Sequence, residues 1–168
     1  MNRKEAIKLI CQHLKDDVIV PILSKKKEEQ SKIIEIIRDK MEIINRLAIV
    51  NFEGHGIRSN GYSVTAIAGN ECDACIVIHG KLGASFEDYP NYPASASFYT
   101  NSFLHKNKGV YDLTKLARRF DEEGGGHPNA CGCRIKIIGN NQSNKGEVQK
   151  KDLDDNLNEW IRMWNKNI

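Results

Sequence analysis

Residues 123–132 read EGGGHPNACG, so three consecutive glycines stand directly before a histidine. A glycine in a structured segment loses more conformational freedom on folding than any other residue. Such a run is therefore either a flexible linker or a place where the backbone comes very close to another group. A linker is disfavoured, because the residues that follow the run are too few to form an independent domain.

The remaining interpretation is a backbone cradle for an anion. Glycines let several N–H groups converge on a phosphate, and a short helix after them would add the positive end of its dipole. Pro128 suits the first position of such a helix, where its missing N–H costs nothing. His127 can donate a hydrogen bond to a phosphate oxygen and adds charge when protonated. A tight turn with a packed histidine is the alternative that these residues leave open.

The composition is that of a globular protein. Of the 168 residues, 40% are hydrophobic and 28% charged, a balance that excludes a disordered chain. The net charge of +3 is compatible with a phosphate-bearing partner but is too small for a protein that binds nucleic acid by charge alone. No apolar run approaches the ~20 residues that span a bilayer, and the charged N-terminus does not resemble a signal peptide. We therefore expect a cytoplasmic protein with no membrane partner.

The spacing of apolar residues predicts an α/β fold, with a mixed β-sheet flanked by helices behind an N-terminal helical connector. Residues 1–46 would form the connector, with a short amphipathic helix at 3–15 and a long helix from Ser24 to about Arg46. Residues 47–168 would form the main domain. Its expected strands are 47–52, 74–80, 94–101 and 133–138, and its expected helices are 63–68, 112–120 and a closing helix around 153–164.

The sequence from Phe120 through GGGHPNACGCRI resembles the motif that names the DHH-associated domain, the C-terminal domain of DHH-family phosphoesterases. This hydrolase family includes RecJ-type exonucleases, oligoribonucleases, phosphoadenosine phosphatases and cyclic dinucleotide phosphodiesterases. Upstream, ASFYTNS and VYDLTKLARRF resemble the family's serine-containing strand and the helix before its glycines. The resemblance covers roughly residues 46–165, and the helix at 24–46 resembles the connector between the two family domains.

The resemblance implies a substrate-binding site around the glycines. The glycines and the histidine would hold a substrate phosphate or its neighbouring sugar, and one asparagine lies at a variable position close by. Residues of the serine-containing strand would face the same cleft. The implied site residues are Gly124, Gly125, Gly126, His127, Asn129, Ser97, Tyr99 and Thr100.

Two features depart from the family pattern. Many members carry an arginine on the serine-containing strand, where this chain has Tyr99 or Thr100, so a cation that pairs with phosphate would be missing. In addition, Asp121, Glu122 and Glu123 directly precede the glycines. Carboxylates beside an anion site raise the free energy of a bound phosphate.

Catalysis in this family belongs to an N-terminal domain, in which Asp-His-His and other Asp and His ligands hold two divalent metal ions. Two-metal hydrolysis of a phosphodiester needs several such ligands close together, and this sequence contains no Asp-His-His motif. The resemblance therefore implies a nucleotide- or oligonucleotide-binding domain that is not catalytic alone and has no cofactor of its own. Manganese would belong to the absent catalytic domain. The expected partners are a short oligonucleotide or nucleotide phosphate, and a separate DHH catalytic domain or a second copy of the chain.

Other chemistry is conceivable at the cysteines and the aromatic residues. Cys72 and Cys75, with Cys131 and Cys133, have a loose zinc spacing, which would make the chain a non-enzymatic zinc- or nucleotide-binding regulatory or partner-binding module. Cysteines in apolar strands more often pack as small hydrophobic residues. Cys131 with His127, at helical i,i+4 spacing, would be a nucleophile pair without a third orienting residue. Five aromatic residues could stack on bases, although strand alternation assigns about half of them to packing: Phe98, Tyr99, Phe103, Tyr89 and Tyr92.

Overall fold

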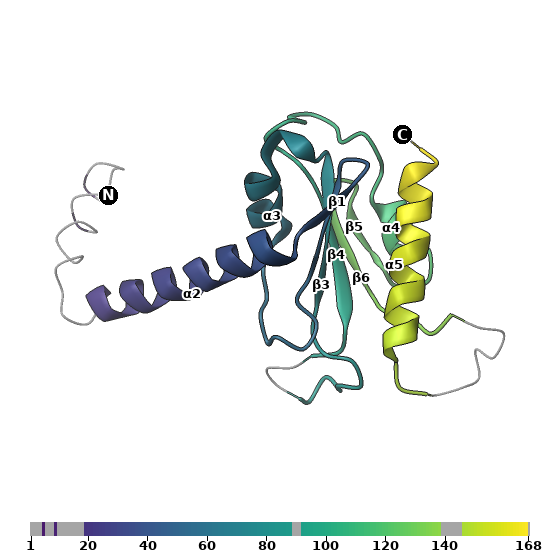
Figure 1. The fold of residues 1–168 in the computed structure, drawn as a ribbon, viewed down its shortest axis with the longest axis horizontal. Helices are drawn as coiled ribbons and strands as arrows, with labels where there is room; N and C mark the ends of the chain where they lie inside the picture. The colour runs from purple at the N-terminus through teal and green to yellow at the C-terminus, as the bar shows by residue number, and fades with distance from the viewer. Residues whose placement is uncertain (1–4, 6–8, 10–18, 89–91, 139–145, 168) are drawn as a thin grey trace. The chain divides into compact units, whose positions relative to one another are not determined.

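A computed structural model describes residues 5, 9, 19–88, 92–138 and 146–167 (Figure 1). The chain divides into two compact units, residues 1–36 and 37–168. The helix expected at 3–15 lies almost entirely outside the described residues. Within the described residues, no helix combines the length and the apolar character that crossing a membrane requires.

Helix α2 (Ile19–Lys40) runs through the boundary between the two units. It begins before Ser24, because Pro21 lies in its first turn, where the missing N–H of proline costs nothing. It ends at Lys40, and the expected continuation to Arg46 is wrong. Residues Glu42–Ile44 form strand β1, which pairs with the next strand through a turn at Asn45 and Arg46. Both turn residues have positive φ, 46° and 66°, which a helix does not allow.

The larger unit contains a six-stranded mixed sheet in the order β1-β2-β3-β4-β6-β5. Strands β2 (Leu47–Asn51) and β3 (Ala74–His79) are parallel, and the other neighbours are antiparallel. Between these parallel strands the chain forms helix α3 (Gly61–Ala68) and a 3₁₀ turn, η1 (Gly69–Glu71). The sheet continues with β4 (Ser95–Thr100), β6 (Ala130–Arg134) and β5 (Gly125–His127). The predicted α/β fold with a mixed sheet is therefore confirmed.

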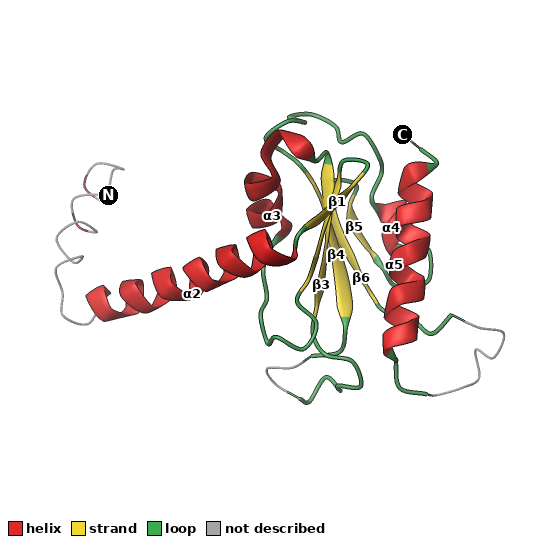
Figure 2. Ribbon diagram, in the orientation of Figure 1, coloured by secondary structure: helices red, strands yellow, loops and turns green. Residues whose placement is uncertain are grey.

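Helices lie on both faces of the sheet, but they cover them unequally (Figures 1 and 2). Helices α4 (Thr114–Ala117) and α5 (Lys150–Asn165) lie on one face. There Trp160 of α5 is fully buried and meets Phe98 of β4 edge-on, with ring centroids 5.1 Å apart. Helix α3 lies on the other face and packs on β3 and β4 through Gly61, which contacts Cys75 and Tyr99. The parts of β4, β6 and β5 beyond α3 remain partly exposed on that face.

Most predicted elements are present with shifted ends. The strands predicted at 47–52, 74–80 and 94–101, the helix at 63–68 and the closing helix are found as β2, β3, β4, α3 and α5. The helix predicted at 112–120 is reduced to the single turn of α4. The strand predicted from Cys133 starts three residues earlier, at Ala130, because the glycine segment pairs with it.

Candidate functional site

The glycine segment forms the edge of the sheet. Residues Gly125–His127 are strand β5, which turns at Pro128 and Asn129 into β6. The short helix expected after the glycines, with Pro128 at its start, is therefore wrong. Neighbouring N–H groups along a strand point to opposite edges, so they do not converge on one anion as a cradle would require. The strand forms because pairing of Gly126 with Cys131 brings two backbones together where a side chain would not fit.

Each of the three glycines has a different environment. A Cβ atom at Gly124 would lie 2.5 Å from the carbonyl oxygen of Ala117. Gly126 has a φ of 135°, and its Cβ would lie 2.8 Å from the carbonyl oxygen of Ala130. Gly125 is less constrained, because its Cβ would first meet the flexible guanidinium of Arg118, 3.4 Å away. Packing therefore requires Gly124 and Gly126, whereas at Gly125 a side chain would meet only the flexible end of Arg118.

The register of the sheet places Gly125 in a row of small residues. Gly125 pairs with Gly132 on β6, and Gly132 pairs with Ser97 on β4. Residues directly opposite each other on neighbouring strands project to the same face. On one side of this row lie His79, Ser95 and Arg134, and on the other side lie Cys75, Tyr99, Ala130 and His127.

Two adjoining hollows lie along this face. One has a volume of about 340 Å³, and its lining includes Arg58, Phe86, Tyr92, Gly124, Gly132 and Arg134. The other has a volume of about 380 Å³, and its lining includes Arg58, Asn60, His79 and Tyr99. Arg58, Ser95 and Ser97 line both hollows, so we treat the two as one feature and call it the groove.

Part of the predicted site lies at the groove. Ser97, Tyr99 and Gly124 line it, and Gly125 lies next to it, because Gly125 pairs with the lining residue Gly132. His127 is exposed at the end of the neighbouring row, opposite Ala130. Its Nδ1 accepts a hydrogen bond from the backbone N–H of Asn129, at 3.2 Å. Gly126 is on the same edge strand as His127, but it faces the opposite side of the sheet.

Thr100 and Asn129 are placed elsewhere. Thr100 follows Tyr99 on β4, so strand alternation turns its side chain to the opposite face, where it is buried. Its Oγ1 donates to Oδ1 of Asn129 at 3.2 Å, and the N–H of Gly109 donates to the same oxygen. These two residues connect the hairpin to the loop after β4 and do not line the groove.

Sequence reasoning missed several residues of the groove, among them Arg58, His79 and Ser95. Ser95 could have been found from alternation, because it precedes Ser97 by two positions. Arg58 and His79 lie at or beyond the carboxyl ends of the parallel strands β2 and β3. That is the place where open α/β sheets commonly bind ligands, so their position was the available signal.

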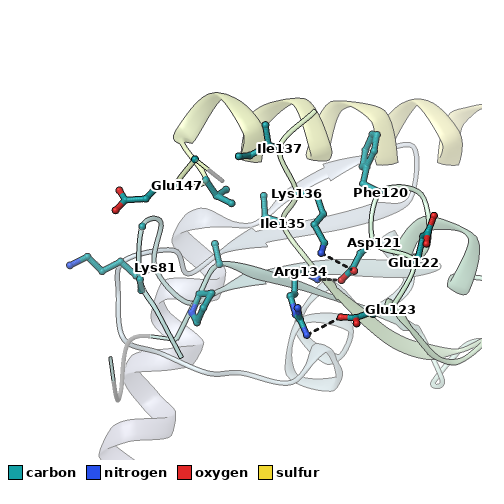
Figure 3. A pocket seen from close by; sticks show the side chains of 16 residues that line it. Lys81, Phe120, Asp121, Glu122, Glu123, Arg134, Ile135, Lys136, Ile137 and Glu147 are labelled. Atoms are coloured by element: carbon teal, nitrogen blue, oxygen red, sulfur yellow. Dashed lines mark hydrogen bonds and ion pairs between the residues drawn. The ribbon is translucent and has the colours of Figure 1, made fainter. Parts of the chain in front are cut away.

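The carboxylates that precede the glycines are largely compensated (Figure 3). Oδ1 of Asp121 lies 3.2 Å from Nζ of Lys136, and its Oδ2 accepts a hydrogen bond from the backbone N–H of Arg134. Burial raises the pKa of Asp121, but these two partners outweigh burial and hold the pKa below its ordinary value. Glu123 pairs with Arg134 at 3.1 Å. Both pairs border a larger cavity of about 770 Å³, and the unfavourable charge that the sequence suggested is therefore mostly neutralised.

The cysteines behave as packed side chains. Cys72, Cys75, Cys131 and Cys133 are buried and unpaired. Burial raises the pKa of Cys131 to about 12, so its thiol stays protonated near neutral pH. The helical spacing expected for Cys131 and His127 is wrong, because the two residues lie on different strands of the hairpin. Within the described ranges, no three His, Cys, Asp or Glu side chains are grouped so as to hold a metal ion.

The aromatic residues divide between core and groove. Phe98 is fully buried, whereas Tyr92 and Tyr99 line the groove. Phe103 is exposed in the loop after β4, away from the groove lining, and Tyr89 lies outside the described residues. Phe86, which the sequence did not single out, is also exposed and lies under the guanidinium of Arg134, 5.4 Å from the ring centroid.

No family model matches the sequence, and no curated protein matches it significantly. Among solved structures, the chain is similar to PggH, a pGpG-specific phosphodiesterase from Vibrio cholerae, with a TM-score of 0.66 and 12% sequence identity over 100% of this chain and 52% of that one. It is also similar to an exopolyphosphatase-related protein from Bacteroides fragilis, with a TM-score of 0.52 and 16% identity over 97% of this chain and 44% of that one.

The chain thus spans about half the length of the two solved structures. At these identities the likeness is one of fold.

Proposed function

We propose that the chain is the substrate-binding domain of a DHH-type phosphoesterase and binds the phosphate of a nucleotide or short oligonucleotide in the groove. It would not hydrolyse the ligand alone. A separate DHH catalytic domain, which would hold the manganese ions, or a second copy of the chain would be its protein partner. The likeness in fold to a phosphodiesterase and to an exopolyphosphatase-related protein supports this assignment.

The observation that carries the proposal is the floor of the groove. Gly132, which lines the groove, and its pairing partner Gly125 have no side chains, so a ligand in the groove can lie directly against the backbone there. Gly132 is also required by packing, since its Cβ would lie 3.0 Å from the carbonyl oxygen of Ala96. The hydroxyl of Ser97, in the same row, makes no hydrogen bond with another described residue, so it can donate to a phosphate oxygen.

The test is a Gly125→Val variant titrated calorimetrically with pGpG, the compound in the description of the first solved structure. The valine side chain would project beside Gly132, at the edge of the groove, and its nearest neighbour is the flexible end of Arg118, so the fold should persist. We expect binding to be lost while the thermal unfolding temperature changes little. His127→Ala should weaken binding by about 1–3 kcal/mol, the cost of a hydrogen bond to a charged group.

Gly146→Val is the matched control, because Gly146 lies outside the groove and its Cβ would make only an ordinary contact with Ile137, 3.7 Å away. That variant should bind as the parent does. Equal binding by Gly125→Val and the parent would refute a phosphate site on the row formed by Gly125, Gly132 and Ser97.

A further inference from the structure

We propose that Arg58, in the loop between β2 and α3, is the cation that pairs with the ligand phosphate in the groove. This inference rests on the proposed function and names the residue that supplies the charge. In the family that the sequence resembles, many members carry such a cation on the strand that corresponds to β4, where this chain has Tyr99 or Thr100. The structure brings an arginine to the same face from a different segment.

The loop that carries Arg58 is fixed at both ends. At its start, the N–H of Phe52 donates to the carbonyl of Ile78 and the N–H of Gly54 donates to the carbonyl of Gly80. These bonds extend the pairing of the parallel strands beyond the end of β2. At its end, the side chain of Asn60 caps α3 by accepting a hydrogen bond from the N–H of Ser63. Arg58 is two residues before this cap, so its backbone position is well defined.

The guanidinium of Arg58 is also positioned. It lies over the ring of Tyr92, with Cζ 4.5 Å from the ring centroid, a cation–π geometry. Arg58 lines both hollows of the groove, together with Ser95 and Ser97. A guanidinium stacked on a ring keeps its planar edge of N–H donors free, and that edge matches two phosphate oxygens.

Arg58 differs from the other charged residues around the groove in having no partner of opposite charge among the described residues. Arg134, the other arginine that lines it, is already paired with Glu123. Among the described residues, Arg58 has no carboxylate partner. His79 lines the same hollow and is buried, and burial lowers the pKa of this imidazole, so His79 adds no positive charge near neutral pH. Of the two arginines among the described residues that line the groove, Arg58 is therefore the one whose charge is left for an anion.

The hydroxyl groups beside Arg58 complete a set of donors. Ser95 and Ser97 are two positions apart on β4 and point to the same face. Within the described residues, neither hydroxyl takes part in a hydrogen bond. A guanidinium and two free hydroxyls suit the several acceptor oxygens of a phosphate group better than a single carbonyl or amide oxygen.

The experiment compares three variants in titrations with pGpG at low and moderate salt. Arg58→Ala should weaken binding at least tenfold and reduce the slope of log affinity against log salt by about one. Arg58→Lys should recover only part of the affinity, because an ammonium group is a point charge without the fork of donors. Arg162→Ala is the matched control: Arg162 is an exposed arginine on α5, on the opposite side of the sheet, and its loss should leave binding unchanged.

The outcomes separate this inference from the proposed function. If Arg58→Ala binds pGpG with the parent's affinity and salt dependence while Gly125→Val does not bind, the groove is a ligand site and the role of Arg58 is refuted. If the parent protein binds neither pGpG nor inorganic phosphate, both proposals fail. Equal losses in Arg58→Ala and Arg162→Ala would indicate a nonspecific effect of charge and would also overturn the inference.

Discussion

His79 at the end of β3 is a buried histidine that the fold keeps neutral. It is 7% exposed and stacks on Phe52 with ring centroids 6.2 Å apart. Burial, and then the charge of Arg58, lowers the pKa of His79 from 6.5 to about 4. The unfolded chain therefore binds a proton at this residue near pH 6.5, whereas the folded chain does so only near pH 4. Because the unfolded state binds more protons in this window, the free energy of unfolding falls as the pH drops through it.

We predict a loss of roughly 3 kcal/mol in the free energy of unfolding between pH 7 and pH 4 from His79 alone. Urea unfolding at several pH values measures it. In His79→Gln this part of the pH dependence should disappear. Asp73, Asp121 and Glu159 also have lowered pKa values, and their contribution begins to be lost below about pH 5, so the part that belongs to His79 is the difference between the parent and His79→Gln. A parent and a His79→Gln variant with the same pH profile would contradict the prediction.

At single residues, the sequence predicted what depends on strand periodicity and missed what depends on loops. Ser97 and Tyr99 are two positions apart, so one face of β4 had to hold both, and Thr100 had to face the other way. The family resemblance assigned Thr100 to the cleft, because similarity of motifs matches positions in the sequence and does not consider which face of the strand each side chain points to. Arg58 reaches the same face only through the turn after β2, and no local pattern fixes where such a turn leads.

Helix α5 is joined to the sheet by Asn156, a fully buried polar residue. Its Nδ2 donates to the carbonyl oxygen of Lys136 at 2.6 Å, and its Oδ1 accepts from the N–H of the same residue at 3.3 Å. Lys136 lies just beyond the end of β6, so the asparagine side chain acts as its pairing partner. The bond also helps to position Lys136 beside Asp121.

We therefore expect Asn156→Ala to lower the free energy of unfolding by about 2–4 kcal/mol, because it leaves the N–H and the carbonyl of Lys136 without their partner. Chemical denaturation gives the value. Asn158→Ala, an exposed asparagine on the same helix, is the control and should change the free energy of unfolding by no more than about 0.5 kcal/mol. Equal effects of the two substitutions would show that the pairing of Asn156 with Lys136 contributes little.

At the scale of elements, the sequence predicted long periodic segments well and ambiguous short ones poorly. Helix α5 and strand β3 have strong apolar patterns, and both are present. Residues 41–46 continue the apolar spacing of α2, yet Asn45 and Arg46 turn the chain into a hairpin whose second strand is buried in the sheet. The glycine segment was equally ambiguous, because glycine fits both an anion cradle and an edge strand in close contact with its neighbour.

At the scale of the whole chain, we expect this chain to bind the ligand and a separate domain to catalyse its hydrolysis. The fold resembles parts of two solved proteins about twice as long as this chain. The sequence lacks the Asp-His-His motif of the catalytic domain, and in the described residues no side chains are grouped to hold a metal ion. Two-metal hydrolysis depends on ions held a few ångströms apart by several such ligands, so we expect the proposed site to bind and orient a phosphate and a separate domain to hold the metal ions.

The purified chain should consequently bind pGpG without cleaving it when manganese is added. Chromatographic analysis of the products after prolonged incubation tests this, with the Gly125→Val and His127→Ala variants run in parallel. A contaminating phosphodiesterase would act equally in all three samples, because it does not depend on the groove. Turnover that requires manganese, survives rigorous purification and is lost in both variants would instead place catalysis in this chain, and the assignment as a binding domain would then be wrong.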